Sequence, residues 1–360
     1  MTKIHIILPN RIGDSILTLP SLLCLKQLLN KYRQYHVEVT VFSHYPLIRY
    51  FQALNLFEFR TFNLFSKFAS WINIPDKAYF LSTTSKNIGY HAKTSYGLSL
   101  PNKKHVHYDI DLPYLSILQH NSELPDDLFY FLQSYYSLPV YSIKRFGICL
   151  EFGFSVQQII DEFRFDNSSL LTGKEYFDNE PMFNSEYVVF CMEAANNKRH
   201  AAYRRWNEEN FFVLAEKLYA DYGVESIFIG LKNQPRIMEK PYFKDMRGKL
   251  NLDQILQLLN HSRGYFGNDT GPLHLANLLR KRSIGIYPSD GAIAYRPLFP
   301  EFNRAYINTQ TPEEIYPFIE FLISEDSSPV DVKKSNSYQH TPNPSCTPSV
   351  PCSSSSCNFE

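Results

Sequence analysis

Short apolar runs alternate with amphipathic segments through the second half of this chain, and this alternation is the strongest constraint on its fold. Apolar runs that predict buried strands cover residues 187–191, 226–229, 264–266 and 283–287. Helical periodicity separates them, most clearly at residues 252–260, where Leu252, Ile255, Leu256 and Leu259 share one face. Parallel strands need a crossover between them, usually a helix. The pattern therefore predicts a doubly wound, parallel α/β domain.

The helix that precedes the run at 226–229 carries its own start and stop signals. Asn207 can cap it, and Glu208 and Glu209 complement the positive end of the helix dipole. Gly223 is a typical stop signal. The predicted core stripe of this helix is Phe211, Leu214, Ala215 and Leu218.

The first half opens in the same way. Residues 4–8 predict a buried strand, residues 16–25 a helix and residues 36–42 a second strand. The pattern from 43 to 165 is harder to interpret, and polar residues at 166–184 predict a passage between domains. We therefore predict two Rossmann-like α/β domains, residues 1–170 and residues 185–325.

Composition excludes several classes of protein. Lys plus Arg and Asp plus Glu both number 36, so the formal net charge is zero and a nucleic-acid partner is not expected. No run of 18 or more apolar residues occurs, and the first 14 residues lack the long apolar core of a signal peptide. We expect a soluble, cytoplasmic protein.

The final residues, 326–360, are rich in Ser, Pro, Lys and Asn and predict a disordered tail. Its three cysteines form no CxxC pair, which favours unstructured thiols over a metal site. Cys24, Cys149 and Cys191 have apolar neighbours and are expected in the core. HExxH, DxD, GxGxxG and GxxxxGK[ST] motifs do not occur. We therefore predict no metal site and no cofactor.

The turn after the strand at 264–266 gathers five polar or special residues: Asn268, Asp269, Thr270, Gly271 and His274. A helix begins here, with Thr270 or Gly271 placed to cap it and Pro272 suited to its first position. Its free N–H groups can bind a diphosphate, which Gly271 lets approach and which Thr270 and His274 can reach. Asp269 suits a sugar hydroxyl better than a phosphate. The alternative is that Asp269 and Thr270 only cap the helix.

Two further features lie near helix starts. Arg204 and Arg205 can neutralise a diphosphate, although a solvated surface pair would have the same sequence. Asp14 follows Gly13 after the first strand. It is either a first-turn carboxylate that stabilises a helix or a general base that faces the diphosphate site.

A local basic concentration lies between residues 86 and 107 of this otherwise neutral chain. It includes Lys86, His91 and Lys93. The segment is either a solvated loop or a site for an anionic ligand.

Three blocks of the sequence resemble glycosyltransferase family 9, the heptosyltransferases of lipopolysaccharide core assembly. The blocks are "IGDSILTLPSL" (12–22), "RRWNEENFFVLAEKL" (204–218) and "MRGKLNLDQILQLLNHSRGYFGNDTGPLHLA" (246–276). Residues 43–185 match only loosely, with "KNIGY" (86–90) as the best point. Together the blocks and their spacing span most of the chain.

The resemblance implies a GT-B fold, in which two Rossmann-like domains face each other across a cleft. It places Asp14 on the catalytic base and Asp269, Thr270, Gly271 and His274 on the donor-binding turn. The implied reaction is metal-independent and inverting. Asp14 takes a proton from the acceptor hydroxyl, while His274, Arg204 and the helix dipole stabilise the departing diphosphate.

The sequence departs from the family pattern at several positions. Leu8 stands where a basic residue is usual, and Arg11 is a nearby substitute. Glu193 lies in the turn after the strand at 187–191, where a carboxylate is unfavourable beside a diphosphate unless it turns away. The acidic residue that often holds the donor ribose is missing after Gly230.

We therefore expect transfer of a sugar from a nucleotide-diphosphate sugar to a lipopolysaccharide core or related surface glycan. ADP-heptose is our first candidate for the donor. The acceptor would contact Arg11, Lys86, His91 and Lys93, and the enzyme would contact the inner membrane transiently. Two alternatives stay open. One is a nucleotide-sugar-binding protein that has lost turnover, and the other is transfer to a protein or a different glycan.

Overall fold

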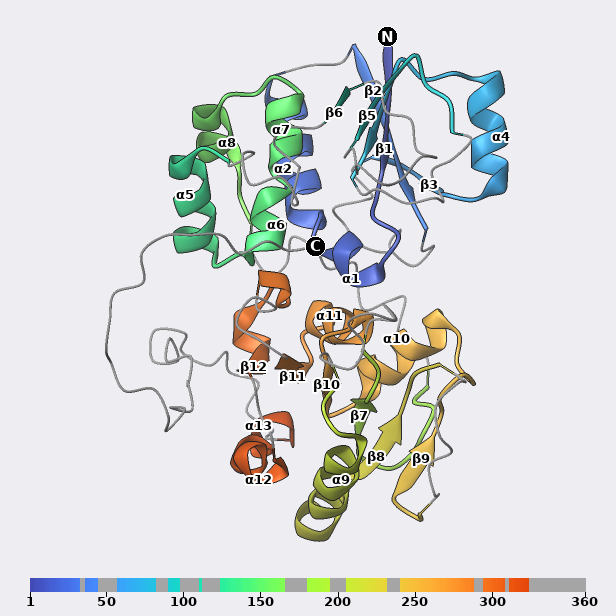
Figure 1. Cartoon of the computed structure of the whole chain (residues 1–360), viewed down its shortest axis with the longest axis vertical. Coiled ribbons are helices and arrows are strands. Elements are labelled where there is room, and N and C mark those ends of the chain that lie inside the picture. The colour runs from blue at the N-terminus through green and yellow to red at the C-terminus, as the bar shows by residue number, and fades with distance from the viewer. Residues whose placement is uncertain are drawn as a thin grey trace, which may run out of the picture.

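The computed structural model contains two six-stranded sheets, one in each half of the chain (Figure 1). The structure describes residues 1–32, 36–44, 57–81, 90–97, 110–111, 124–165, 180–194, 205–231, 240–287, 294–307 and 311–323. The first sheet consists of β1 (Thr2–Ile7), β2 (Val37–Ser43), β3 (Glu58–Thr61), β4 (Lys77–Phe80), β5 (Thr94–Gly97) and β6 (Ile110–Asp111). The second consists of β7 (Tyr187–Cys191), β8 (Glu225–Phe228), β9 (Phe243–Asp245), β10 (Gly264–Asn268), β11 (Arg282–Tyr287) and β12 (Asn303–Ile307).

Both sheets are parallel and have the same topology. The first has the order β3-β2-β1-β4-β5-β6, and the second has the order β12-β11-β10-β7-β8-β9. In each sheet the first and fourth strands of that half pair at the centre, for example Ile4 with Lys77 and Gly264 with Val188. From the first strand of each half the next two strands are added on one side, and from the fourth strand they are added on the other side, so the strand order changes direction at these central pairs. Ligands of doubly wound sheets bind at such switch points, outside the carboxyl ends of the strands.

Helices cover both faces of each sheet. In the first half they are α1 (Ile12–Ile16), α2 (Leu19–Lys31), α4 (Leu64–Ile72), α5 (Asp126–Tyr136), α6 (Val140–Lys144), α7 (Gly147–Glu151) and α8 (Val156–Glu162). In the second they are α9 (Glu208–Tyr222), α10 (Leu252–His261), α11 (Gly271–Leu278), α12 (Pro312–Ile315) and α13 (Glu320–Ile323), with short 3-10 turns at Pro300–Phe302 and Tyr316–Phe318. In Figure 1, α2 and α5 to α8 lie on one side of the first sheet and α4 lies on the other.

The helix α9 forms as its sequence signals predict. The Asn207 side chain accepts a hydrogen bond from the backbone N–H of Glu209 at 3.2 Å, and Gly223 ends the helix with a φ of 68°. The predicted stripe of Phe211, Leu214, Ala215 and Leu218 is the buried face. These residues pack against the buried residues of β7 and β8, so the cap, the stop signal and the apolar stripe all specify the same helix.

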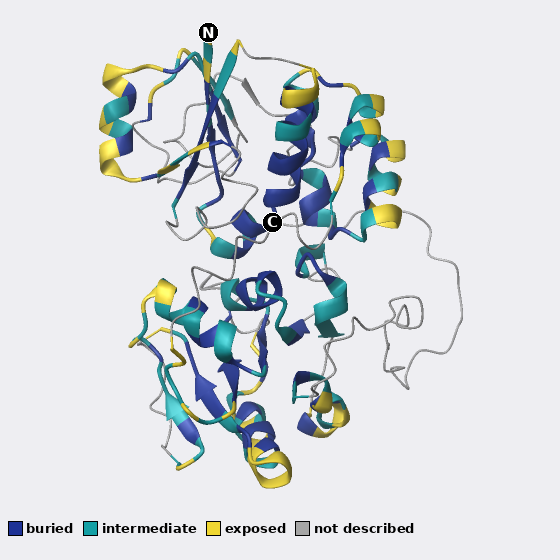
Figure 2. Cartoon of the chain, turned by 180° about the vertical axis from the view of Figure 1, so that it is seen from behind, coloured by how far each residue is buried: buried dark blue, intermediate teal, exposed yellow. Residues whose placement is uncertain are grey.

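The first apolar helical stretch, Ile12–Lys31, is long and apolar enough to cross a membrane by length and composition. It is interrupted between α1 and α2, and Pro20 occupies the first turn of α2, where its missing N–H costs no hydrogen bond. Most of the stretch is buried inside the molecule, as the dark blue ribbon of α2 shows (Figure 2). Its apolar character is therefore explained by packing against the first sheet.

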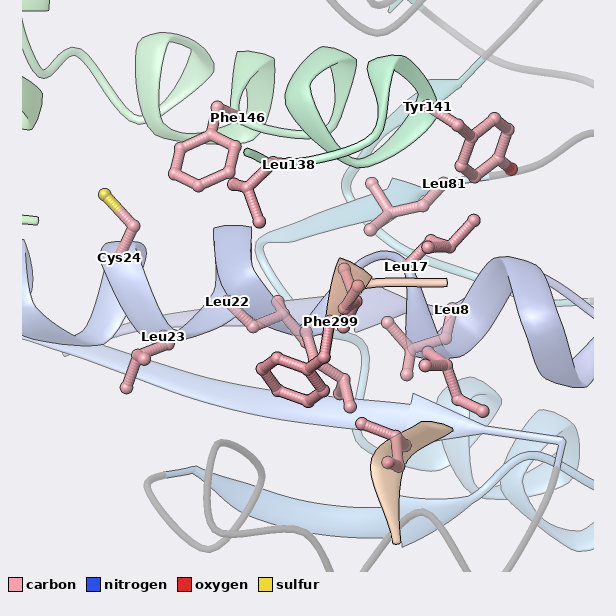
Figure 3. Close-up of a cluster of buried hydrophobic side chains, with 14 of the residues drawn as sticks. Leu8, Leu17, Leu22, Leu23, Cys24, Leu81, Leu138, Tyr141, Phe146 and Phe299 are labelled. Atoms are coloured by element: carbon pink, nitrogen blue, oxygen red, sulfur yellow. The ribbon is translucent and has the colours of Figure 1, made fainter. Parts of the chain in front are cut away.

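One hydrophobic cluster runs through both halves of the chain. It includes Leu22 of α2 and also Phe299, which comes from the second half and lies among the side chains of the first (Figure 3). The ring of Phe299 stacks on Phe165 with centroids 5.8 Å apart. Nearby, Arg296 donates a hydrogen bond to the carbonyl of Ser137 at 2.7 Å. The two sheets are thus joined by buried apolar surface as well as by the chain between them. The predicted tail, 326–360, lies outside the described residues.

Candidate active site between the two sheets

Asp14 lies at the switch point of the first sheet. The strand β1 ends at Ile7, and α1 begins five residues later with Asp14 in its first turn. The hydroxyl of Ser15 donates to the carbonyl of Pro9 at 2.6 Å, and the hydroxyl of Thr18 donates to the carbonyl of Asp14 at 2.9 Å. These two bonds fix the loop and the backbone that carries the carboxylate.

The surroundings of Asp14 bring opposing charges to its carboxyl group. Burial raises its pKa above the ordinary value for aspartate. The positive charges of Arg11 and Arg145 oppose this effect, and the charge of Asp269 adds to it. A carboxylate with a raised pKa is a stronger base than an exposed one, which suits it for taking a proton from a hydroxyl group.

The switch point of the second sheet contains the turn 268–271. Asn268 is fully buried at the end of β10. Its amide nitrogen donates to the carbonyl of Met192 at 2.7 Å, and its amide oxygen accepts the backbone N–H of Trp206 at 3.2 Å. Asn268 therefore ties together β10, the end of β7 and the segment before α9. These bonds favour a role in positioning the turn.

Thr270 precedes α11 without capping it. It occupies the capping position, but its hydroxyl makes no bond to the first N–H groups of the helix. The hydroxyl lies 3.3 Å from the carbonyl of Asn268 and 3.3 Å from the Tyr265 hydroxyl. The alternative in which Thr270 simply caps the helix does not describe this geometry. The positive end of α11 is left available to an anion.

Two glycines bring the two switch points into contact. A Cβ atom on Gly13 of α1 would lie 2.8 Å from Cδ2 of His274 on α11. A Cβ on Gly271 would overlap the side chain of Ile12. Neither glycine has a positive φ. Their common property is the missing side chain, which allows α1 and α11 to approach closely and brings the Asp14 loop to the start of α11.

His274 is buried beside Asp269. Its Nε2 atom lies 3.8 Å from Oδ1 of Asp269, and its Nδ1 atom has no hydrogen-bond partner within the described residues. A buried ring nitrogen without a partner is costly, so an occupant of the site that bonded to it would remove that cost. The two residues are also close in sequence, which is why the sequence pattern grouped them.

Arg145 is a buried residue of this region that the sequence did not single out. One end of its guanidinium donates to the carbonyl of Leu81, just beyond β4, at 2.8 Å. The other end donates to the Tyr141 hydroxyl, and the group lies 4.3 Å from the centre of that ring. Its charge lowers the pKa of Asp14. Arg145 lies in the part of the chain whose sequence pattern is hard to interpret, so the sequence gave no indication that its charge affects Asp14.

The side chain of Glu193, which follows β7, points toward the loop after β8. Its carboxylate accepts a hydrogen bond from the backbone N–H of Leu231, and a Cβ on Gly230 would lie 2.8 Å from its Cδ atom. Burial raises its pKa, while the Leu231 bond and the charges of Arg205 and Arg247 lower it. The carboxylate therefore lies at the end of β8, where the sequence lacks the expected acidic residue after Gly230.

The structure separates some of the predicted acceptor residues from Asp14. Lys93 forms an ion pair with Asp76 at 2.7 Å, and the backbone N–H of Lys3 donates to the same carboxylate. These residues mark the amino edge of the first sheet, whereas Asp14 lies at its carboxyl edge. His91 also precedes β5 and contacts α4 through Trp71. Arg11, beside Asp14, is exposed, and Lys86 and Arg204 lie outside the described residues.

The two parallel sheets and the contact between their switch points define a GT-B architecture of the glycosyltransferase type. The family model for glycosyltransferase family 9 (heptosyltransferase) matches residues 79–314. The chain therefore belongs to glycosyltransferase family 9. No curated protein sequence gives a significant match to the chain.

Solved structures share this fold at low sequence identity. The E. coli ADP-heptose lipopolysaccharide heptosyltransferase II has 15% identity and a TM-score of 0.59, over 89% of this chain and 98% of that chain. The E. coli heptosyltransferase WaaC with ADP has 14% identity and a TM-score of 0.54, over 89% and 100%. A family 9 glycosyl transferase from Veillonella parvula has 16% identity and a TM-score of 0.52, over 90% of both chains.

Proposed function

We propose that this protein is an inverting glycosyltransferase that transfers heptose from ADP-heptose to a lipopolysaccharide core or related surface glycan. One observation carries this proposal. The Gly13 contact with His274 brings a partly buried carboxylate, Asp14, to the uncapped amino end of α11. A base therefore lies across from an anion site, which is the arrangement that sugar transfer from a nucleotide diphosphate requires.

Asp14 is the proposed general base. An acceptor hydroxyl is a weak nucleophile, and loss of its proton to the Asp14 carboxylate strengthens it as it attacks the anomeric carbon. The attack comes from the face opposite the departing diphosphate, so the new bond forms as the old one breaks and the configuration inverts. The raised pKa of Asp14 makes it a better proton acceptor.

The start of α11 is the proposed site of the departing diphosphate. Its N–H groups and helix dipole stabilise negative charge, and Gly271 leaves room for close approach. Thr270 and His274 would donate hydrogen bonds to the same phosphates, the latter through the buried ring nitrogen that has no described partner. Asp269 would orient His274 or hold a sugar hydroxyl. Arg204 remains a predicted donor contact outside the described residues.

Glu193 is the proposed partner of the donor ribose. A carboxylate at the end of the second strand binds ribose hydroxyls in many doubly wound domains. Here β8 is that strand, and Glu193 reaches across Gly230 to the backbone N–H of Leu231. The carboxylate from the neighbouring strand would thus replace the acidic residue that the sequence lacks after Gly230.

Metal-independent transfer is part of the proposal. Across the part of the chain that the structure describes, no three or more His, Cys, Asp or Glu residues cluster in a way that could hold a metal ion. The positive end of α11 and His274 would stabilise the diphosphate instead. Turnover that persists after treatment with EDTA is the expected result, and restoration of lost turnover by added divalent metal would contradict it.

The acceptor is proposed to enter from the first sheet. Arg11 is exposed beside Asp14 and is the described basic residue best placed to meet an acidic sugar. We retain Lys86 as a predicted contact, whereas Lys93 and His91 lie at the other edge of the sheet and have no place in this acceptor site. We propose a cytoplasmic location with transient contact at the inner membrane.

Thermal unfolding with a panel of nucleotides and nucleotide sugars tests the donor. A ligand at about 100 times its dissociation constant stabilises the folded state by roughly 2.7 kcal/mol. We expect ADP and ADP-heptose to raise the unfolding temperature, while UDP, GDP and CMP do not. A rise in the unfolding temperature with UDP alone would indicate a UDP-sugar donor in place of ADP-heptose and leave the proposed transfer reaction unchanged. Binding of ADP-heptose without transfer to any lipopolysaccharide, glycan or protein acceptor would favour the binding protein that has lost turnover.

A further inference from the structure

The fully buried side chain of Tyr265 reaches the turn 268–271 from inside the second half of the chain. Tyr265 belongs to β10 and shares one face of the strand with Gly267, two residues further on. A Cβ atom on Gly267 would lie 2.6 Å from the Tyr265 hydroxyl oxygen and 2.7 Å from the carbonyl oxygen of Cys191. The missing side chain of Gly267 therefore leaves the space in which the ring of Tyr265 leans along the strand toward the turn.

The Tyr265 hydroxyl ends beside the hydroxyl of Thr270. The two oxygen atoms are 3.3 Å apart, and either can donate to the other. Burial raises the pKa of Tyr265 well above its ordinary value, so its hydroxyl keeps its proton and stays a donor. The Thr270 oxygen also lies 3.3 Å from the carbonyl oxygen of Asn268 and 3.9 Å from the Sγ atom of Cys191. Thr270 therefore has partners inside the protein that compete with a ligand for its single hydrogen.

A second tyrosine of the same sheet shows what a structural hydroxyl does. Tyr187 of β7 is also buried, and both tyrosines belong to the hydrophobic cluster that runs through both halves of the chain. The hydroxyl of Tyr187 donates to the carbonyl of Leu258 on α10 at 3.0 Å. A carbonyl only accepts, so this bond holds α10 on the sheet and ends there. The Tyr265 hydroxyl instead meets a second hydroxyl, which can both accept a hydrogen bond and donate one to a third group.

The direction of the hydrogen bonds at Thr270 decides whether this residue can hold a phosphate. A threonine hydroxyl has one hydrogen to donate and two lone pairs that accept, whereas an ionised phosphate oxygen accepts. When the hydrogen of Thr270 points to the carbonyl of Asn268, none is left for an anion at the start of α11. A hydrogen bond donated by Tyr265 occupies a lone pair of Thr270 and strengthens Thr270 as a donor, since bonds in a chain polarise one another.

We propose that Tyr265 is a positioning residue for the donor, whose hydroxyl donates to Thr270 and so directs the hydrogen of Thr270 to the diphosphate. Tyr265 is fully buried and acts through Thr270 without touching the donor. This inference rests on the proposed function in one respect, since it takes the diphosphate to bind at the start of α11. It goes beyond that function because it adds a core residue that determines how well the turn binds.

Calorimetric titration of the full chain with ADP tests the role of Tyr265. Tyr265→Phe keeps the ring in the core and removes the hydroxyl. We expect the dissociation constant for ADP to rise roughly three- to tenfold. The matched control is Tyr187→Phe, which removes a buried hydroxyl from the same sheet and is expected to bind ADP as the wild type does. Thermal unfolding of both variants checks that a difference in stability does not account for the difference in binding.

Substitutions of Thr270 show whether Tyr265 acts through it. Thr270→Val removes the hydroxyl, and Thr270→Ser keeps it. We expect Tyr265→Phe to weaken ADP binding roughly three- to tenfold in the Thr270→Ser background and by less than about twofold in the Thr270→Val background. A merely structural tyrosine would weaken binding by the same factor in both backgrounds.

Three results would overturn the role of Tyr265. One is a Tyr265→Phe variant that binds ADP like the wild type while Thr270→Val binds it more weakly. Another is equal weakening by Tyr265→Phe in the serine and valine backgrounds, and the third is a Tyr187→Phe variant that loses as much ADP affinity as Tyr265→Phe. Failure of the proposed function is distinguishable. A wild type that does not bind ADP, or a Thr270→Val variant that binds it like the wild type, would remove the diphosphate from Thr270 and this role of Tyr265 with it.

Discussion

The two sheets of this protein have the same strand order but opposite chemistry at their switch points. The first places a carboxylate, Asp14, at the start of a short helix, with Arg11 and Arg145 close enough to influence its pKa. The second leaves the start of α11 without a side-chain cap and turns its own carboxylate, Glu193, toward β8. One loop thus carries the proposed base, and the other carries the proposed site for an anion.

The comparison separates what topology decides from what the loops decide. The shared strand order places both loops at the carboxyl edge of a parallel sheet. The different residues after β1 and β10 then determine what each loop can bind. The close approach at Gly13 and Gly271 brings the two loops together, as the proposed function requires, because the proposed base and the proposed anion site must face the same sugar.

The largest expected effect follows from filling the contact between the two loops. Gly271→Ala places a methyl group on the side chain of Ile12, and overpacking of this kind costs about 1–3 kcal/mol. We expect a lower unfolding temperature and loss of turnover, because the new methyl group pushes α1 and Asp14 away from α11. Denaturant unfolding and a transfer assay measure the two effects.

The double variant with Ile12→Ala tests this explanation. Removal of the overlapping side chain should restore part of the lost stability and turnover. If the double variant is as impaired as the sum of the two single variants, the two residues do not couple and the contact between the switch points has no such role.

Glu193→Gln tests the difference between the two carboxylates. We expect the dissociation constant for ADP to rise roughly tenfold or more, since hydrogen bonds to charged groups contribute about 1.5–3 kcal/mol. Calorimetric titration measures it, with Glu209→Gln on the exposed face of α9 as the control. Unchanged ADP binding by Glu193→Gln would remove Glu193 from the donor site.

Arg11→Gln should give a smaller effect on the first switch point. The charge of Arg11 lowers the pKa of Asp14, so its removal raises that pKa. Since the base acts in its deprotonated form, the acidic limb of the kcat/KM profile should move to higher pH by a fraction of a unit. Arg164→Gln, at an exposed residue that follows α8, is the control. A shift to lower pH would contradict the assignment of Asp14 as the base.

Much of the second half was predictable from sequence. Asn207 and Gly223 set the limits of α9, and strict apolar patterns marked β7 and β11. The strands β7 and β11 are internal to the sheet and buried on both faces, so they show a clear apolar pattern. The region from 43 to 165 was harder, partly because α4 exposes its apolar side and buries serines. Such a helix reverses the usual relation between apolar residues and burial.

The grouping of residues in the candidate site was predictable only where they are close in sequence. Asp269, Thr270, Gly271 and His274 share one turn, so the sequence alone grouped them. Arg145 and Glu193 could not be assigned this way, because their positions depend on contacts with Leu81 and Leu231, which follow β4 and β8. Lys93 and His91 were grouped with Lys86 by a local count of basic residues, which does not distinguish the two edges of a sheet.

The most direct test of the central claim compares Asp14→Asn with the wild type in two assays. Calorimetric titration with ADP and a transfer assay with ADP-heptose and lipopolysaccharide acceptor measure binding and turnover separately. Our account predicts the same dissociation constant for ADP and a loss of turnover of roughly 10²–10⁴-fold, since general base catalysis contributes that much. Near-normal turnover by Asp14→Asn would contradict the assignment of Asp14 as the base that faces the donor on α11.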